Sequence, residues 1–290
     1  MLMPESAKKG YLWVNGEFKS WEDSTTHLIV HGLHYGSSVF EGERAYNGKI
    51  FKGPEHTARL FRSANILGMN IPFNASDVEQ AKEELVKKNG LTDAYIRAFV
   101  WRGGEEMGIS APASSINIAI GAWDWPAYFP KELRDNGIKL TQVNWKKPAP
   151  DTAPTQAKAA GLYMIGTMAK HEAMERGFHD ALMLDYRGQV AESSGANLFI
   201  VKDGVLKTPI PDCFLNGITR LTIIDLAKKH GIAVQEKVIM PDELFDADEV
   251  FLTGTAAEIV AVGQIDDHHY TVGSVTRLLR DAYETLVGKS

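Results

Sequence analysis

The sequence predicts an α+β protein of two domains, each built from mixed strands and helices. Segments with the period-two alternation of strands and segments with helical periodicity are interspersed along all 290 residues. They do not follow the regular strand–helix–strand rhythm of a long parallel sheet, which argues against Rossmann and barrel architectures. The aromatic- and proline-rich segment 123–130 interrupts the pattern. It therefore separates a small N-terminal α/β domain, residues 1–127, from a large C-terminal domain, residues 137–290, with a linker over residues 128–136.

The first domain is expected to contain hairpins followed by helices and long strands. Asn15-Gly16 and Asn47-Gly48 each lie between short strand-like runs, and Asn-Gly is the strongest local signal for a two-residue hairpin turn. Apolar spacing and turn residues predict helices over residues 54–68 and 77–88, and strands over residues 94–101 and 115–122. Period two places Tyr95 and Arg97 on one face of the first of these strands.

The second domain is expected to intersperse seven strands with three helices. The predicted helices span residues 162–176, 217–230 and 274–287. The predicted strands span residues 137–143, 180–184, 188–192, 198–201, 205–206, 232–238 and 249–253. A proline-rich extended loop, residues 147–155, leads toward Lys158.

Composition limits the class of protein and its partners. Hydrophobic residues make up 44% and charged residues 23%, which is typical of a globular chain. The formal net charge is −6 and no basic run occurs, which argues against a nucleic-acid partner. Cys213 is the single cysteine, so no internal disulfide can form and a reducing compartment is expected. No signal peptide and no apolar run of about 20 residues is present, so we expect a cytoplasmic protein without a membrane partner.

Two kinds of site receive no support. His27, His31 and His34 are spaced as if to bind a metal, but no cysteine or carboxylate joins them at the tight spacing of zinc sites. We expect these histidines to pack in a loop or an interface, and we predict no metal. The chain also lacks the glycine fingerprint of dinucleotide-binding domains and the serine elbow of common hydrolases.

One group of segments does predict a chemistry. Lys158 is flanked by Ala157, Ala159 and Gly161, and apolar crowding lowers the pKa of a lysine so that it can form an imine. An acidic turn with Glu192 follows about thirty residues later. Residues 216–220 and 253–258 each combine glycine with threonine, and we expect both to bind phosphate through helix N-termini. A lysine, a carboxylate and a phosphate anchor are what pyridoxal phosphate requires of a protein.

Five segments in this order resemble the branched-chain amino acid aminotransferases, which are fold type IV pyridoxal phosphate enzymes. They are residues 31–42, 157–163, 192–199, 216–220 and 253–258. The likeness extends from about Tyr11 to Ile265. It implies a fold type IV architecture in which the large C-terminal domain binds the cofactor.

The resemblance implies a role for each matching residue. Lys158 would be the catalytic residue, forming the Schiff base and moving the proton of the substrate, while Glu192 would pair with the pyridine nitrogen and Tyr163 with the phenolic oxygen. The phosphate would be held by Arg59, Ile218, Thr219 and Thr255. The substrate would contact Tyr35, Phe40, Tyr95, Arg97, Trp125, Tyr128, Tyr163, Thr255 and Ala256, with Arg97 suited to a second carboxylate.

The implied activity is transfer of the amino group of leucine, isoleucine or valine to 2-oxoglutarate. The implied partner is a second copy of the chain, with Tyr35 reaching across a homodimer, and a larger assembly of dimers stays open. Glu43, Ala98 and Ser110 depart from the usual pattern near the pocket, which leaves side-chain preference open.

Two alternatives remain. One is another enzyme of the same fold, a D-amino acid or (R)-amine transaminase or an aminodeoxychorismate lyase, which the residues at 34–36 and 39–42 disfavour. The other is a catalytically silent binding protein, which the presence of Lys158, Tyr163 and Glu192 disfavours.

Overall fold

The computed structural model describes residues 4–125 and 129–289 and divides into two compact units. Unit 1 comprises Met1–Pro126 and Ala157–Leu162, and unit 2 comprises Ala127–Gln156 and Tyr163–Ser290. The short segment that carries Lys158 is therefore part of unit 1, although the chain on both sides of it belongs to unit 2. The domain boundaries expected at residues 127 and 137 stay a prediction, and residues 126–128 at the expected junction lie outside the described part of the chain.

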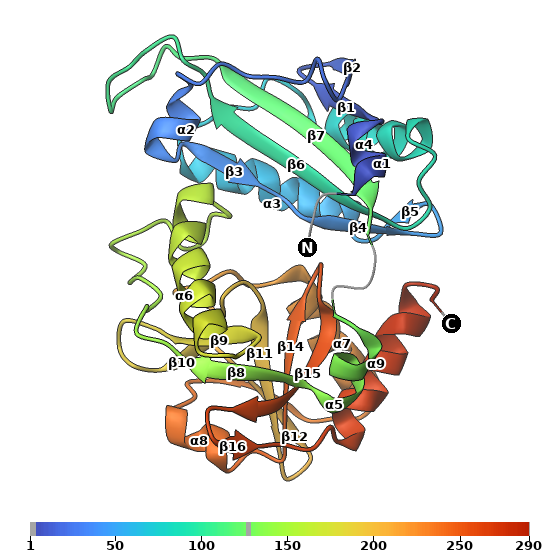
Figure 1. Ribbon diagram of the computed structural model, residues 1–290, viewed down its shortest axis with the longest axis vertical. Coiled ribbons are helices and arrows are strands. Elements are labelled where there is room, and N and C mark those ends of the chain that lie inside the picture. The colour runs from blue at the N-terminus through green and yellow to red at the C-terminus, as the bar shows by residue number, and fades with distance from the viewer. Residues whose placement is uncertain (1–3, 126–128, 290) are drawn as a thin grey trace. The chain divides into compact units, whose positions relative to one another are not determined.

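Unit 1 is an antiparallel seven-stranded sheet with helices packed on it (Figure 1). The strands run in the order β2-β1-β7-β6-β4-β5, and β3 pairs with β6. Their bounds are β1 Tyr11–Val14, β2 Glu17–Ser20, β3 Ser38–Phe40, β4 Glu43–Tyr46, β5 Lys49–Ile50, β6 Ala94–Arg102 and β7 Ile116–Asp124. The helices are α1 Glu5–Lys8, α2 His31–Tyr35, α3 Gly53–Ile66, α4 Ala75–Lys88 and the short 3₁₀ helix η1 Ala160–Leu162.

The two Asn-Gly turns connect hairpins, as the sequence predicts. Asn15 and Gly16 have φ of 50° and 97°, and Asn47 and Gly48 have φ of 50° and 76°. Positive φ at both central residues defines the turn whose twist matches paired strands. The flanking strands accordingly pair as β1 with β2 and as β4 with β5.

The core of unit 1 lies where α3 and α4 meet the sheet. Leu60 of α3 and Leu85 of α4 are fully buried together with Val39 and Ala98 of the strands. Ala157 and Ala159 belong to the same core. Burial of these small side chains anchors the segment that carries Lys158.

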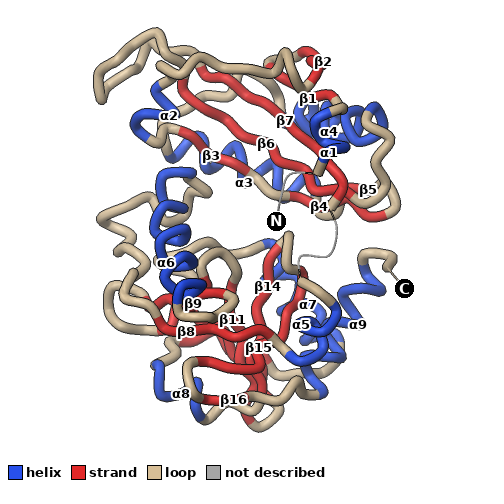
Figure 2. Tube along the Cα trace, in the orientation of Figure 1, coloured by secondary structure: helices blue, strands red, loops and turns tan. Residues whose placement is uncertain are grey.

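Unit 2 is a nine-stranded mixed sheet in the order β10-β9-β8-β15-β14-β11-β12-β13, with β16 pairing β15. The strands are β8 Ile138–Gln142, β9 Asp180–Leu184, β10 Val190–Ser193, β11 Asn197–Lys202, β12 Val205–Pro209, β13 Val234–Lys237, β14 Glu249–Gly254, β15 Glu258–Ile265 and β16 His268–His269. The helices are α5 Lys131–Asn136, α6 Tyr163–Glu175, α7 Ile218–Lys229, α8 Pro241–Phe245 and α9 Ser274–Leu286. Figure 2 shows these helices outside the strands; α6 packs on β8 and β9, while α7 and α9 pack on β14. The predicted mixture of sheets and helices is confirmed.

One predicted helix N-terminus is wrong. Thr255, Ala256 and Ala257 form the turn of a hairpin between β14 and β15, with Gly254 paired to Glu258. Glu258 adopts a φ of 57°, which closes this turn, so the chain returns as a strand instead of starting a helix. Among the described helices, none has both the length and the apolar character needed to cross a bilayer.

Candidate active site

The backbone of Lys158 is fixed on both sides within unit 1. Its N–H donates to Ser63 Oγ on α3 at 3.0 Å, and its carbonyl accepts the N–H of Phe40 at 3.1 Å. The next residue, Ala159, forms an antiparallel bridge with Val39. Lys158 Nζ lies 4.9 Å from the centre of the Phe40 ring. The lysine is therefore held at a defined position beside β3.

The surroundings of Lys158 weaken its affinity for a proton. Burial lowers the pKa of the amine to about 8, and the nearby charges of Arg59 and Arg97 act in the same direction. Glu41 and Tyr95 oppose them. A pKa of about 8 leaves a usable neutral fraction near pH 7, and the neutral amine is the nucleophile and base.

Arg59 of α3 forms an ion pair with the buried carboxylate of Glu41. Its Nε and Nη2 donate to Glu41 at 2.5 and 2.8 Å, and His56 Nδ1 lies 2.7 Å from the same group. Burial alone would raise the pKa of Glu41, but Arg59 and His56 hold it well below its usual range. The sequence predicts only a phosphate contact for Arg59 and assigns no role to Glu41 or His56. The only signal for Glu41 in the sequence is its place after Val39 and Phe40 in the segment 31–42 that resembles the family.

Four predicted substrate residues gather in unit 1. Arg97 Nη2 donates to the Tyr95 hydroxyl at 2.8 Å, as expected for neighbours on one face of β6. The Arg97 guanidinium lies 4.6 Å from the Phe40 ring centre, and Tyr95 stacks on Trp125 at 4.6 Å. Arg97 Nε is buried and has no hydrogen-bond partner among the described residues, so it can donate to a carboxylate. Tyr128 lies outside the described residues.

Tyr35 lies elsewhere in unit 1, on an apolar surface. Half of its side chain is exposed, and its hydroxyl donates to the carbonyl of Met107 at 3.4 Å. His31 Nε2 lies 3.1 Å from the carbonyls of Gly108 and Ile109, so it holds the same loop. The exposed apolar residues here are Leu28, Ile29, Leu33, Tyr35, Met107 and Ile109. We name this set the apolar patch.

In unit 2 the carboxylate of Glu192 is held from two sides. Lys147 Nζ lies 2.7 Å from Oε1, and Asn197 Nδ2 donates to Oε2 at 3.0 Å. Asn197 also donates to the carbonyl of Leu215 at 3.0 Å and accepts the N–H of Gly217 at 3.1 Å. It therefore ties Glu192 to the start of α7. Glu192 was predictable from the sequence, whereas Lys147 and Asn197 were not.

The N-terminus of α7 is where the sequence predicts a phosphate contact. The first N–H groups of a helix, here those of Ile218 and Thr219, lack partners within the helix and attract negative charge. A Cβ at Gly217 would lie 2.2 Å from Asn197 Oδ1, so a larger residue there would displace the Asn197 amide. Arg220 is fully buried and donates to Asn216 Oδ1 at 2.9 Å, which fixes the loop before the helix.

The remaining predicted cofactor residues of unit 2 lie close to the Glu192 turn. A Cβ at Gly254 would lie 3.5 Å from Ala196 Cβ, so the hairpin turn with Thr255 and Ala256 adjoins the residues after Glu192. Tyr163 begins α6, and a Cβ at Gly166 on that helix would lie 2.5 Å from the carbonyl of Ser194. The glycine permits this close approach.

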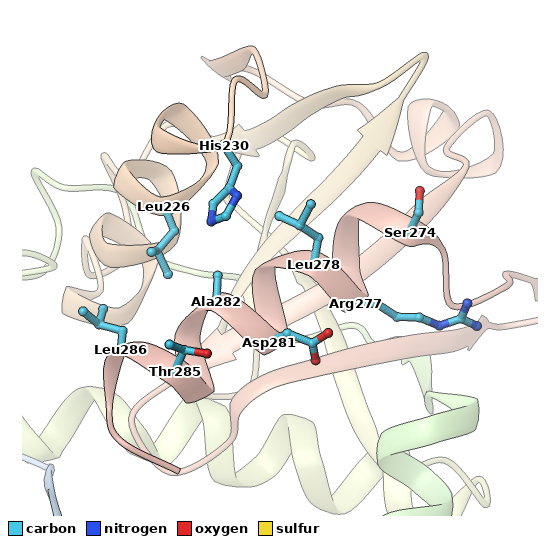
Figure 3. Close-up of a pocket in the computed structure, with 9 residues that line it drawn as sticks. All are labelled: Leu226, His230, Ser274, Arg277, Leu278, Asp281, Ala282, Thr285 and Leu286. Carbon is cyan, nitrogen blue, oxygen red and sulfur yellow. The ribbon is translucent and has the colours of Figure 1, made fainter. Parts of the chain in front are cut away.

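Two other features of unit 2 contain none of the predicted site residues. Figure 3 shows a groove along α7 and α9, with Leu226, Leu278 and Leu286 among its lining residues. Asp185, Asp212 and Cys213 carry potential metal-ligand atoms within 4.8 Å of one another. Arg187 Nη2 lies 2.6 and 2.8 Å from the two aspartates, and burial raises the pKa of the thiol to about 12. Arg187 thus pairs with both carboxylates of this cluster, and the thiol stays protonated.

Comparison with known proteins identifies the family. The family described as amino-transferase class IV matches residues 38–265. The chain belongs to this family. A branched-chain-amino-acid aminotransferase of Pseudomonas aeruginosa is 42% identical, over 98% of this chain and 95% of its own length. The enzyme of the same name from Escherichia coli K12 is 41% identical, over 95% and 92%.

Solved structures agree with the sequence relatives. The branched-chain amino acid aminotransferase of Escherichia coli gives a TM-score of 0.94 at 40% identity, covering 97% of this chain and 95% of that one. An enzyme of the same name from T.th., solved with pyridoxamine 5'-phosphate, also gives 0.94 at 40% identity, covering 98% and 96%. The predicted resemblance and fold type are confirmed.

Proposed function

We propose that this chain is a pyridoxal phosphate-dependent aminotransferase that moves the amino group of leucine, isoleucine or valine to 2-oxoglutarate. The observation that carries the proposal is the fixed amine of Lys158, whose pKa of about 8 suits both imine formation and proton transfer. The names of the relatives support the class of amino donor.

The residues present fit the cofactor. Lys158 supplies the amine, Glu192 a carboxylate for the pyridine nitrogen, and Tyr163 a hydroxyl for the phenolic oxygen. The phosphate is assigned to the N–H groups of Ile218 and Thr219, with Arg59 and Thr255. Gly217 supports this assignment, because the absence of a side chain there leaves room for the Asn197 amide that orients the start of α7. When bound, the cofactor supplies an aldehyde that captures amino groups and a ring that accepts electrons.

The side chain of Lys158 carries the proton transfer. In each half-reaction its Nζ would move a proton between the α-carbon of the substrate and C4′ of the bound cofactor, taking one from the α-carbon of the amino donor and returning one to the α-carbon of the acceptor. Asn197 and Lys147 hold the two oxygens of Glu192, which keeps that carboxylate oriented throughout.

The substrate residues of unit 1 offer both apolar and charged contacts. Phe40 and Trp125 present aromatic surface to a branched side chain, and Tyr163 is assigned to the same wall. The buried Nε of Arg97 is a donor for the distal carboxylate of the glutamate or 2-oxoglutarate partner. Tyr95, Thr255 and Ala256 are assigned to the α-carboxylate, and Tyr35 and Tyr128 to the distal one.

We further propose a homodimer in a cytoplasmic compartment. The apolar patch includes Tyr35, and exposed apolar groups of this kind mark protein interfaces. A second copy covering the patch would receive Tyr35. The single cysteine, Cys213, is buried and suits a reducing compartment.

The test begins with the purified protein and added pyridoxal phosphate. We expect a visible absorbance band, loss of that band with borohydride, and a cofactor label on Lys158 by peptide mapping. A panel of L- and D-amino donors with 2-oxoglutarate then assigns the substrate, and L-leucine, L-isoleucine and L-valine should be preferred. Colourless protein would refute the cofactor, and turnover of D-leucine alone would establish the D-amino acid alternative instead.

A further inference from the structure

Glu41 is a fully buried carboxylate to which the proposed function assigns no role. It follows Phe40, whose ring lies beneath the amine of Lys158, and its own N–H donates to the carbonyl of Ala98 at 2.7 Å. Its side chain lies 2.7 Å from His56 Nδ1 and accepts two hydrogen bonds from Arg59. A buried carboxylate with this many donors is a fixed negative charge.

The same contacts determine the orientation of Arg59. The residue is only 6% exposed, and the paired bonds from Nε and Nη2 to Glu41 set the plane of its guanidinium. Removing the carboxylate would leave a buried cation without its counter-ion, which is costly. Arg59 therefore depends on Glu41 for its position.

Four residues of unit 1 influence the charge of Lys158. Arg59 on α3 and Arg97 on β6 disfavour the ammonium form of the lysine, whereas Glu41 and Tyr95 favour it. A second buried pair, Glu43 on β4 and Lys82 on α4, lies next along the chain, with Lys82 Nζ 2.6 Å from Glu43 Oε1 and 2.9 Å from Thr57 Oγ1. His56 completes the group through Glu41.

We propose that Glu41 is a positioning residue for the transamination: it fixes the Arg59 guanidinium and offsets the charge of Arg59 at the amine of Lys158. This inference rests on the role assigned to Lys158 in the proposed function. Glu43 is the natural comparison, because it is an equally buried carboxylate two residues along whose cation is Lys82 instead of Arg59.

The test measures the proton equilibrium of Lys158 directly. The full-length chain, freed of cofactor, is labelled briefly with acetic anhydride across a range of pH, and modification at Lys158 is quantified by mass spectrometry. In Glu41→Gln we expect the pKa of Lys158 to fall by about one unit, at the low end of the effect of one nearby charge. Starting from a pKa of about 8, this gives roughly fivefold faster labelling at pH 7. Glu43→Gln should leave the profile where it is in the parent protein.

A double variant covers the case in which Glu41→Gln does not fold, as judged by circular dichroism. Glu41→Gln combined with Arg59→Met removes both charges, so the pKa of Lys158 should equal or exceed the parent value. An unchanged profile in Glu41→Gln, an equal shift in Glu43→Gln, or a double variant below the parent would each overturn the proposal. Borohydride labelling of the parent tests the role of Lys158 separately, because a missing cofactor adduct would refute the proposed function without altering the acetylation profile.

Discussion

Asn197 provides the sharpest test of how unit 2 builds its part of the site. Three hydrogen bonds join its amide to Glu192, to the carbonyl of Leu215 and to the N–H of Gly217. Asn197→Ala removes these hydrogen bonds from buried polar groups. Each buried group left without a partner lowers the free energy of unfolding by about 1 to 3 kcal/mol. Because water can reach some of them after truncation, we expect a loss of about 3 kcal/mol in the free energy of unfolding.

The same substitution should weaken cofactor binding. Asn197 orients both Glu192 and the first N–H groups of α7, so its loss misaligns the two groups assigned to opposite ends of the cofactor. We expect the dissociation constant of pyridoxal phosphate to rise roughly tenfold, which corresponds to about 1.4 kcal/mol. Absorbance titration of the folded variant measures this constant, and urea denaturation measures the stability.

Tyr270→Phe is the matched control for Asn197→Ala. Its buried hydroxyl donates to the carbonyl of Leu244 at 2.9 Å within the core of unit 2, among none of the predicted site residues. This variant should lose about 1 kcal/mol of stability and bind the cofactor as the parent does. If Asn197→Ala keeps the parent affinity, or if Tyr270→Phe loses as much, the link from Glu192 to α7 does not orient the cofactor.

Four further outcomes follow from the site and the apolar patch. Lys158→Ala should abolish the borohydride-trapped label and slow transamination of L-leucine by at least roughly a thousandfold, since both imine formation and proton transfer are lost; parent-like turnover would refute its role. Labelling of Lys158 in the cofactor-free chain should rise with pH with its midpoint at about 8, because its pKa is lowered and only the neutral amine reacts; a midpoint near that of an ordinary lysine would contradict the burial argument. Arg97→Leu should raise KM for 2-oxoglutarate at least roughly tenfold more than KM for L-leucine, because the guanidinium is assigned to the distal carboxylate; equal changes in steady-state kinetics would remove that assignment. Ile109→Asp places a charge on a side chain that is 83% exposed in the apolar patch and should produce monomers by size-exclusion chromatography with light scattering, whereas an unchanged assembly would place the interface elsewhere.

Local sequence signals predicted most of the elements, because their causes are local. The Asn-Gly pairs fix positive φ at adjacent residues and therefore define the two hairpins of unit 1 wherever the rest of the chain lies. Apolar spacing predicted α3, α4, α7 and α9 for the same reason. The same reasoning predicted the turn at Thr255 wrongly, because a strand followed by glycine and threonine can continue either as a helix or as a hairpin. Pairing of β14 with β15, a contact set by tertiary structure, decides between them.

The residues of the site also differ in whether their signals in the sequence are local. Lys158, Glu192 and Arg97 stand out because their residue types match a chemistry and their neighbours in sequence are informative. Glu41 and Asn197 do not stand out in the sequence, because their hydrogen-bond partners are distant along the chain.

Glu41 reaches Arg59 across 18 positions and Asn197 reaches Gly217 across 20, and no periodicity encodes such a pair. Both act by holding a group that the sequence could identify. The residues expected to touch the cofactor or substrate are therefore more accessible to sequence reasoning than the buried polar residues that orient them. Substitution of Glu41 and Asn197 tests this division, since neither is assigned a contact with the reacting atoms, yet each should alter a measurable property of a residue that is.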